Sequence, residues 1–140
     1  GMTIGQAMET AQRERPGEAT EADMLRWLSQ LDAQWFQDVV MRHEHEAGAS
    51  FAGYTAETAR DTALLIPVRW EEIYIHYLFA MTDQKLGEVE RYQNDAALFN
   101  QGLTEAQAAY TRDHMPLENA HVKHVFGMGG AARDAAWPFG

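Results

Sequence analysis

The stretch that decides the fold is EVERYQNDAALFNQGLTEAQAAYTRDH, residues 88–114. Its apolar residues recur at alternating steps of three and four, the spacing of one buried face of an α-helix. The stretch contains no proline, and Pro116 just beyond it cannot continue a helix. We therefore predict one long helix from about Glu88 to His114. Its predicted packing face consists of Val89, Tyr92, Ala96, Phe99, Leu103, Ala106 and Tyr110.

A second helix is predicted immediately upstream, between Pro67 and Gly87. Proline suits the first turn of a helix, and Glu71 and Glu72 follow where the helix dipole favours negative charge. Gly87 stands where a left-handed C-terminal cap is expected. Because only a residue or two around Gly87 separates the two helices, we expect an antiparallel hairpin. The expected apolar face of the upstream helix is Trp70, Ile73, Tyr74, Tyr77, Leu78 and Met81.

Two shorter helices are predicted nearer the N-terminus. Residues 3–15 carry apolar side chains at helical spacing, and Pro16-Gly17 ends that helix. Thr20 is the predicted N-cap of the next helix, which we expect to continue to the region of His45 to Gly48. Its apolar stripe consists of Met24, Leu28, Leu31, Trp35 and Val39.

The remaining sequence divides into a loop and a tail. Residues 47–67 are predicted to be a loop, with a turn of helix from Ala56 to Ala63 and a short extended piece from Phe51 to Tyr54. The glycine-rich residues 117–140 are predicted to be a flexible C-terminal arm. The expected fold is therefore all-α, a small helical bundle over residues 2–116 followed by that arm.

Composition narrows the classes of function. A chain of 140 residues is the right size for one domain, and its net charge is −10. Two acidic and two basic residues cancel after Pro116, so the negative charge belongs to the helical part. Tight binding to nucleic acid or to an anionic membrane is disfavoured, because both need Lys and Arg. The chain lacks cysteine, which excludes disulfides and thiolate chemistry.

Neither a membrane span nor a targeting signal is expected. The apolar runs are far shorter than the roughly 20 residues that a spanning helix needs. The start of the chain lacks a basic region followed by an apolar segment, so we expect no signal peptide. Gly1 before Met2 is interpreted as a residue left by tag cleavage.

Six histidines raise the question of a metal site. Alternate residues of a helix point apart, so His43-Glu44-His45-Glu46 cannot share one ion on a helix. The ferritin-like di-iron pattern needs Glu-x-x-His twice, and the sequence does not contain two copies. We therefore predict no metal ligand, no catalytic residue and no cofactor. The alternative is a helical metal-binding (ferritin-like) enzyme or storage protein, which would use Glu72, His76, His43 and His114.

Three aromatic residues near the C-terminus have no evident position in the core. Trp137 and Phe139 follow a glycine-rich segment, and Phe126 precedes it. Large apolar side chains in such a setting are candidates for docking on another chain. Phe126, Trp137 and Phe139 are therefore the predicted partner-docking residues.

Several short strings occur in order along residues 3–116. They are Arg26-Trp-Leu-Ser29, Leu31-Asp32, Phe51-x-Gly-Tyr54, Tyr77-Leu-Phe-Ala-Met-Thr-Asp83, Gly87-Glu88, Arg91-Tyr-Gln-Asn94, Leu98-Phe-Asn100 and His114-Met-Pro116. In these strings the chain resembles small phage and prophage proteins of Gram-positive bacteria that are interpreted as head–tail connectors, or adaptors. It differs from that family's pattern at residues 93–95 and 111–113.

The resemblance implies an all-helical, non-enzymatic subunit of a ring that lies below the portal and joins capsid to tail. The implied partners are the portal protein and tail-completion proteins, and the implied location is the head–tail junction of the virion after synthesis in the host cytoplasm. Such a subunit is homo-oligomeric in the virion and can be monomeric when isolated. Carboxylates facing a channel would repel DNA phosphates, so DNA could pass. A small helical regulator that binds another protein remains a further alternative.

Overall fold

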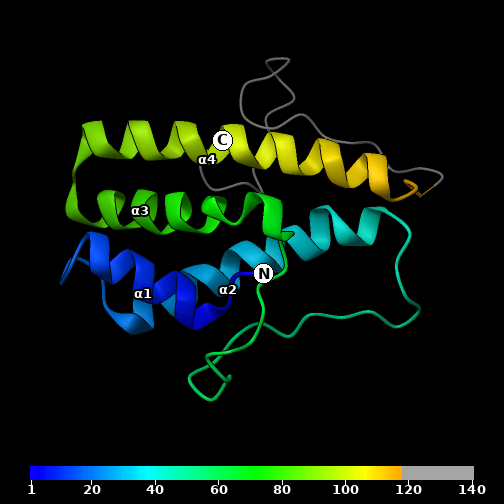
Figure 1. Cartoon of the computed structure of the whole chain (residues 1–140), viewed down its shortest axis with the longest axis horizontal. Coiled ribbons are helices and arrows are strands. Elements are labelled where there is room, and N and C mark those ends of the chain that lie inside the picture. The colour runs from blue at the N-terminus through cyan, green and yellow to red at the C-terminus, as the bar shows by residue number, and fades with distance from the viewer. Residues whose placement is uncertain (118–140) are drawn as a thin grey trace.

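The computed structural model describes residues 1–117 (Figure 1). The predicted all-α bundle is confirmed. The docking residues Phe126, Trp137 and Phe139, and all of the predicted arm except Leu117, lie outside the described residues. Within residues 1–117, each helix is too short or too polar to cross a lipid bilayer. The helices are α1 (Ile4–Glu14), α2 (Glu21–Asp38), α3 (Glu72–Leu86) and α4 (Val89–Asp113), with short 3-10 turns η1 (Val40–Arg42) and η2 (Val68–Trp70).

Helix α3 is the central helix of the bundle. Helix α4 packs along one side of it, and α1 and α2 pack against the other side (Figure 1). Every residue from Ile73 to Ala80 is buried except His76, which is half-buried. A helix that is apolar on nearly all sides is expected to be enclosed by other elements. Helices α1, α2 and α4 enclose α3 in this way.

Helices α3 and α4 form the predicted antiparallel hairpin. Gly87 between them has a left-handed backbone conformation with φ +73°. Its N–H donates to Gln84 O at 3.3 Å, and the N–H of Glu88 donates to Asp83 O at 2.9 Å. These bonds satisfy carbonyls of the last turn of α3, and the positive φ favours glycine. The predicted C-terminal cap is confirmed.

The packing face of α4 is buried in its middle and exposed at its start. Phe99 and Leu103 are inaccessible to solvent, and the centre of the Phe99 ring lies 5.3 Å from that of Tyr77 on α3. At Gly102 the helices approach so closely that a Cβ would lie 2.9 Å from Ile73 Cγ1. Val89 is 65% exposed, so its predicted place on this face is wrong. It lies in the first turn of α4, at the end of the hairpin, where the described residues leave it uncovered.

The starts of α1 and α2 are both capped by threonine side chains. Thr3 Oγ1 accepts from the N–H of Gln6, and the Gln6 side chain accepts from the N–H of Thr3 in return. Thr20 Oγ1 accepts from the N–H of Asp23 at 3.0 Å. The predicted N-cap at Thr20 is confirmed, and α1 lies where the spacing of residues 3–15 predicts a helix.

Helix α2 ends earlier than predicted. It stops at Asp38, and η1 carries the chain only to Arg42, so the predicted end between His45 and Gly48 is wrong. The backbone there pairs with the segment that follows α4: the N–H of Glu44 donates to Met115 O at 2.8 Å, and the N–H of Leu117 donates to Arg42 O at 3.0 Å. These long-range bonds replace the helical ones.

The predicted turn of helix from Ala56 to Ala63 is also wrong. This segment makes isolated turns, and its backbone bonds to the N-terminus instead. The N–H of Gly5 donates to Arg60 O at 2.8 Å, and the N–H of Ile4 donates to Thr62 O at 3.0 Å. Those N–H groups belong to the first turn of α1 and have no partner within that helix, so the loop satisfies them.

Candidate functional site

A buried carboxylate on α2, that of Asp32, joins three parts of the chain. Tyr54 and Tyr74 both donate their hydroxyls to it, and the N–H of Leu65 donates at 3.0 Å. The Tyr74 hydroxyl also accepts from the N–H of Ile66 at 2.7 Å. Every donor in this network has an acceptor, which is the condition for burying polar groups at little cost. The network holds residues 54–66 against α2 and α3.

Burial sets the protonation equilibria of this network. It raises the pKa of the Asp32 carboxyl, although the hydrogen bonds from Tyr54, Tyr74 and Leu65 act in the opposite direction. Burial, with the nearby Asp32 charge, also raises the pKa values of Tyr54 and Tyr74. Both tyrosines therefore remain hydrogen-bond donors at neutral pH, and the network is suited to fixing a loop.

Ser29 and Gly53 complete the attachment of this loop to α2. The N–H of Tyr54 donates to Ser29 Oγ at 3.0 Å. Gly53 has φ +89°, and a Cβ added there would lie 2.9 Å from Ser29 Oγ. Both the backbone conformation and the close approach therefore favour glycine at this position.

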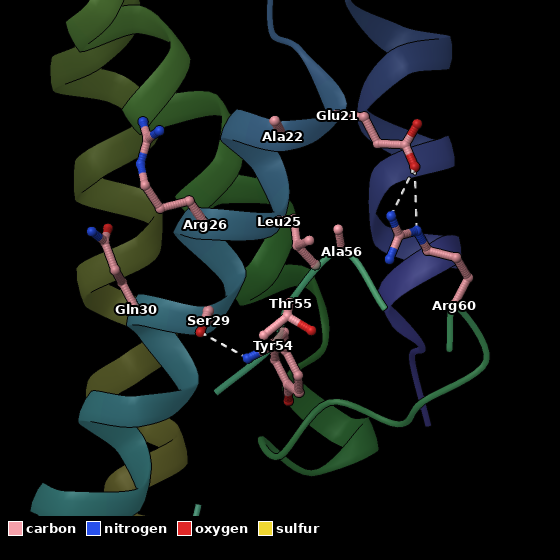
Figure 2. Close-up of a pocket in the computed structure, with 10 residues that line it drawn as sticks. All are labelled: Glu21, Ala22, Leu25, Arg26, Ser29, Gln30, Tyr54, Thr55, Ala56 and Arg60. Atoms are coloured by element: carbon pink, nitrogen blue, oxygen red, sulfur yellow. Dashed lines mark hydrogen bonds and ion pairs between the residues drawn. The ribbon is translucent and has the colours of Figure 1, made fainter. Parts of the chain in front are cut away.

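A groove lies between the first half of α2 and this loop (Figure 2). Its volume of about 630 Å³ falls within the usual range for ligand and docking sites. Arg26 and Gln30 lie on one side of it, and Arg60, paired with Glu21, lies on the other (Figure 2). The residues lining it are Glu21, Ala22, Leu25, Arg26, Ser29, Gln30, Tyr54, Thr55, Ala56 and Arg60.

A second polar cluster ties α1 to the hairpin. Arg15, the C-cap of α1, donates to Asp83 Oδ1 at 2.7 Å and to Asp95 Oδ2 at 2.9 Å. Arg91 donates to the same Asp83 oxygen at 2.7 Å and to Glu18 at 2.6 Å. The Arg15 guanidinium also lies over the ring of Phe79, with its central carbon 3.9 Å from the ring centre. One cluster thus links α1, α3, α4 and the segment before α2.

The two carboxylates of this cluster have different surroundings. Asp83 is inaccessible to solvent, and its Oδ2 has no hydrogen-bond partner. Burial, together with the neighbouring Asp83, raises the pKa of Asp95 to about 6, and Arg15 opposes that rise. The cluster therefore contains a carboxyl group that changes charge in mildly acidic solution.

Two of the four residues of the metal-binding alternative, His43 and His114, make other contacts. His43 Nδ1 bonds to Val39 O at 2.7 Å and its Nε2 to Thr111 Oγ1 at 3.0 Å, so neither nitrogen is free for a metal. The ring of His114 stacks on Tyr110, with the ring centres 3.8 Å apart.

His76 lies in different surroundings. Burial lowers its pKa, and the charges of Glu72 and Glu14 oppose that shift. Across residues 1–117, no three His, Asp or Glu side chains are grouped so that they could hold a metal ion. His76 Nδ1 is buried and has no hydrogen-bond partner in this part of the chain.

Hydrophobic periodicity gave no sign of either polar cluster. The spacing places Tyr74 on an apolar face, and no pattern in the sequence singles out Arg15 or its contact with Asp95, 80 residues away. The sequence signal for the Asp32 network lies in the short strings quoted above, because Ser29, Asp32 and Tyr54 each occur in one of them.

Comparisons of the chain with protein-family models, with curated protein sequences and with solved structures find no match.

Proposed function

We propose that this protein is a non-enzymatic structural protein of a phage, a subunit of the head–tail connector ring that joins the portal to the tail and lets DNA pass. Its partners are then the portal protein and tail-completion proteins, and its place is the head–tail junction of the virion. In this proposal Phe126, Trp137 and Phe139 dock on the portal or on an adjacent subunit. The protein needs no cofactor for this role.

The observation that carries the proposal is the spatial relation between the resembling strings. Ser29 and Asp32 belong to two strings near the start of the chain, and both bond to Tyr54 of a third. Asp83 and Arg91 belong to two later strings and form an ion pair. Residues that carry the resemblance therefore contact one another across sequence separations of 8, 22 and 25 residues. This pattern is expected when the strings specify one shared fold, and it supports assignment to the connector-like proteins.

The charge of the protein suits a passage for DNA. Several basic side chains are already in ion pairs with acidic ones, namely Arg15, Arg26, Arg60, Lys85 and Arg91. They are therefore less available to bind phosphate, while the net charge remains −10. A surface of this kind repels a polyanion over about the Debye length of 8–10 Å.

Reconstitution with the cognate portal protein tests the proposal. The purified protein is mixed with that portal and examined by electron microscopy, with portal alone and portal plus an unrelated acidic helical protein as controls. We expect an additional ring of density on one face of the portal, seen only with this protein. Portal particles that are identical in all three samples would contradict the proposal.

A further inference from the structure

The five charged side chains of the Arg15 cluster carry one more negative charge than positive charge when all are ionised. Arg15 and Arg91 supply two positive charges, whereas Glu18, Asp83 and Asp95 supply three negative ones. Asp83 and Asp95 are both buried. An unbalanced charge in a buried place is costly, and a carboxyl group avoids that cost when it binds a proton. Uptake of one proton would make this cluster neutral.

The two oxygens of Asp83 show where such a proton fits. Oδ1 accepts three N–H bonds, one from Arg15 at 2.7 Å and two from Arg91 at 2.7 Å and 3.0 Å. Oδ2 has no hydrogen-bond partner among residues 1–117, although Asp83 is inaccessible to solvent. A buried acceptor without a donor is costly and rare in folded proteins. A donor is therefore missing beside Oδ2.

Asp95 is the neighbour that can supply this donor. Its Oδ2 accepts from Arg15 at 2.9 Å, which leaves Oδ1 to carry a proton. Burial, followed by a hydrogen bond with the Asp83 side chain, raises the pKa of Asp95 to about 6, and Arg15 opposes that rise. A hydrogen bond between two carboxyl groups needs a proton on one of them, because ionised carboxylates only accept.

The same cluster anchors the connection between α1 and α2, residues 15–20, which is called the strap below. The strap lies beside the α3–α4 turn (left in Figure 1). Arg15 at its start bonds to the two aspartates, and Glu18 in its middle bonds to Arg91 at 2.6 Å. The Arg15 guanidinium lies over the ring of Phe79, which is only 8% exposed. Both of these anchors on the hairpin belong to the cluster.

We propose that Asp83 and Asp95 hold one proton between them, with Asp95 Oδ1–H donating to Asp83 Oδ2, and that this proton keeps the strap closed. Loss of the proton to solvent leaves two buried carboxylates side by side. Their repulsion is relieved when the strap opens and water reaches Asp95, which also uncovers Phe79. The strap is thus a pH-sensitive device, and it does not depend on the proposed connector function.

The charged groups around Asp95 come from all four helices and from the strap. They are Arg15 at the end of α1, Glu18 of the strap, Asp23 of α2, Asp83 and Lys85 of α3, and Arg91 of α4. Asp23 and Lys85 pair with each other, and the charges that act on Asp95 are those of Arg15 and Asp83. Arg15 favours the ionised form of Asp95, whereas Asp83 and burial disfavour it.

The raised pKa of Asp95 determines the direction in which the strap responds to pH. When the strap is open, water surrounds Asp95 and its pKa returns toward the ordinary 3.8. The closed strap therefore binds the proton more tightly than the open strap. Its added stability is complete below about pH 4 and is lost as the pH rises through about 6. Between about pH 5 and pH 7.5 the open fraction should rise about tenfold.

Carbon-13 NMR of the aspartate carboxyl groups tests the shared proton in the unsubstituted protein. The Asp95 signal, assigned by its absence from Asp95→Asn, should titrate near pH 6. The Asp83 signal should respond over the same pH range, because its Oδ2 accepts the hydrogen bond of that proton. An Asp95 signal that titrates near pH 4, or an Asp83 signal that does not respond near pH 6, would overturn the proposal.

Hydrogen exchange tests the opening of the strap. The N–H of Arg15 donates to Ala11 O at 2.9 Å, and the N–H of Gly17 donates to Gln12 Oε1 at 3.2 Å. Exchange of both amides is measured between pH 5 and pH 7.5 and corrected for the intrinsic exchange rate. We expect their protection to fall about tenfold over this range, as the open fraction rises.

Two variants show whether Asp95 causes this fall. Asp95→Asn keeps an N–H donor for Asp83 Oδ2 but cannot titrate, so protection of the strap should stay constant with pH. Glu90→Gln removes an exposed carboxylate from the same helix and should keep the tenfold fall. Protection that changes in the same way in Asp95→Asn as in the unsubstituted protein, or a fall abolished by Glu90→Gln, would overturn the role of the proton in closing the strap.

Discussion

Asp32 holds three segments of the chain together through one buried carboxylate. Its partners Tyr54, Leu65 and Tyr74 come from a loop, from the segment before η2 and from α3. A buried polar group is costly when its partner is lost, because the desolvation penalty then remains without compensation. The stability of the protein should therefore be sensitive to single atoms of this network.

Tyr74→Phe tests that sensitivity. Removal of the hydroxyl leaves the N–H of Ile66 and one Asp32 oxygen without partners, both in the buried interior. We expect the free energy of unfolding to fall by about 2–4 kcal/mol. Urea unfolding followed by tryptophan fluorescence measures the loss.

Tyr54→Phe is the matched control for this change. Tyr54 is only half-buried, and water can replace its hydroxyl more easily, so a loss nearer 1 kcal/mol is expected. Equal losses in the two variants would show that Tyr74 has no special role in the network.

The raised pKa of Asp95 makes the free energy of unfolding decrease as the pH rises. Its pKa rises from 3.8 to about 6 in the folded protein, mainly through burial. The folded state therefore binds this proton more tightly than the unfolded state does. The stabilising contribution is complete below about pH 4 and is lost as the pH rises through about 6.

Asp95→Asn isolates this contribution from those of the other carboxylates. We expect the unfolding free energy of the unsubstituted protein, relative to the variant, to decrease between about pH 4 and pH 6.5. Urea unfolding of both proteins at several pH values gives the difference. A difference that is constant or that increases with pH would contradict the raised pKa.

At the scale of elements, the hairpin is the part that depends most on one backbone conformation. Gly87→Ala places a side chain at φ +73°, and nothing lies within 4 Å of the added Cβ, so the cost is conformational alone. We expect a loss of about 1 kcal/mol in unfolding free energy. Gly87→Asn should lose less, since asparagine tolerates this region better. Thermal unfolding of both variants checks this order, and a stabilised Gly87→Ala protein would contradict it.

The sequence predicts the elements that depend on local chemistry. The long helix, its cap at Gly87 and the threonine N-cap of α2 all follow from short-range spacing and capping rules. The end of α2 and the 56–63 segment were mispredicted, because there the backbone bonds to residues far away in the chain. Glu44 pairs with Met115, and Arg60 pairs with Gly5. Periodicity carries no information about such partners.

At the scale of the whole molecule, local sequence patterns also fail to predict the groove beside α2. The groove exists only because Tyr54 and Ser29 bring a loop from 25 residues away against α2, so no local pattern could place it. The turn between α3 and α4 was predictable from Gly87. Its exposure at Val89 was not, because the spacing continues through that residue as if it were packed.

The contacts of Arg15 join residues that are made at different times during synthesis. The α3–α4 hairpin is built from contacts close in sequence, which form early. Arg15, by contrast, meets its two carboxylates only 68 and 80 residues later. During synthesis, which proceeds from the N-terminus, the Arg15–Asp95 ion pair can therefore form only after Asp95 has left the ribosome. The last ion pair of α1 thus depends on a residue that is made 80 positions later.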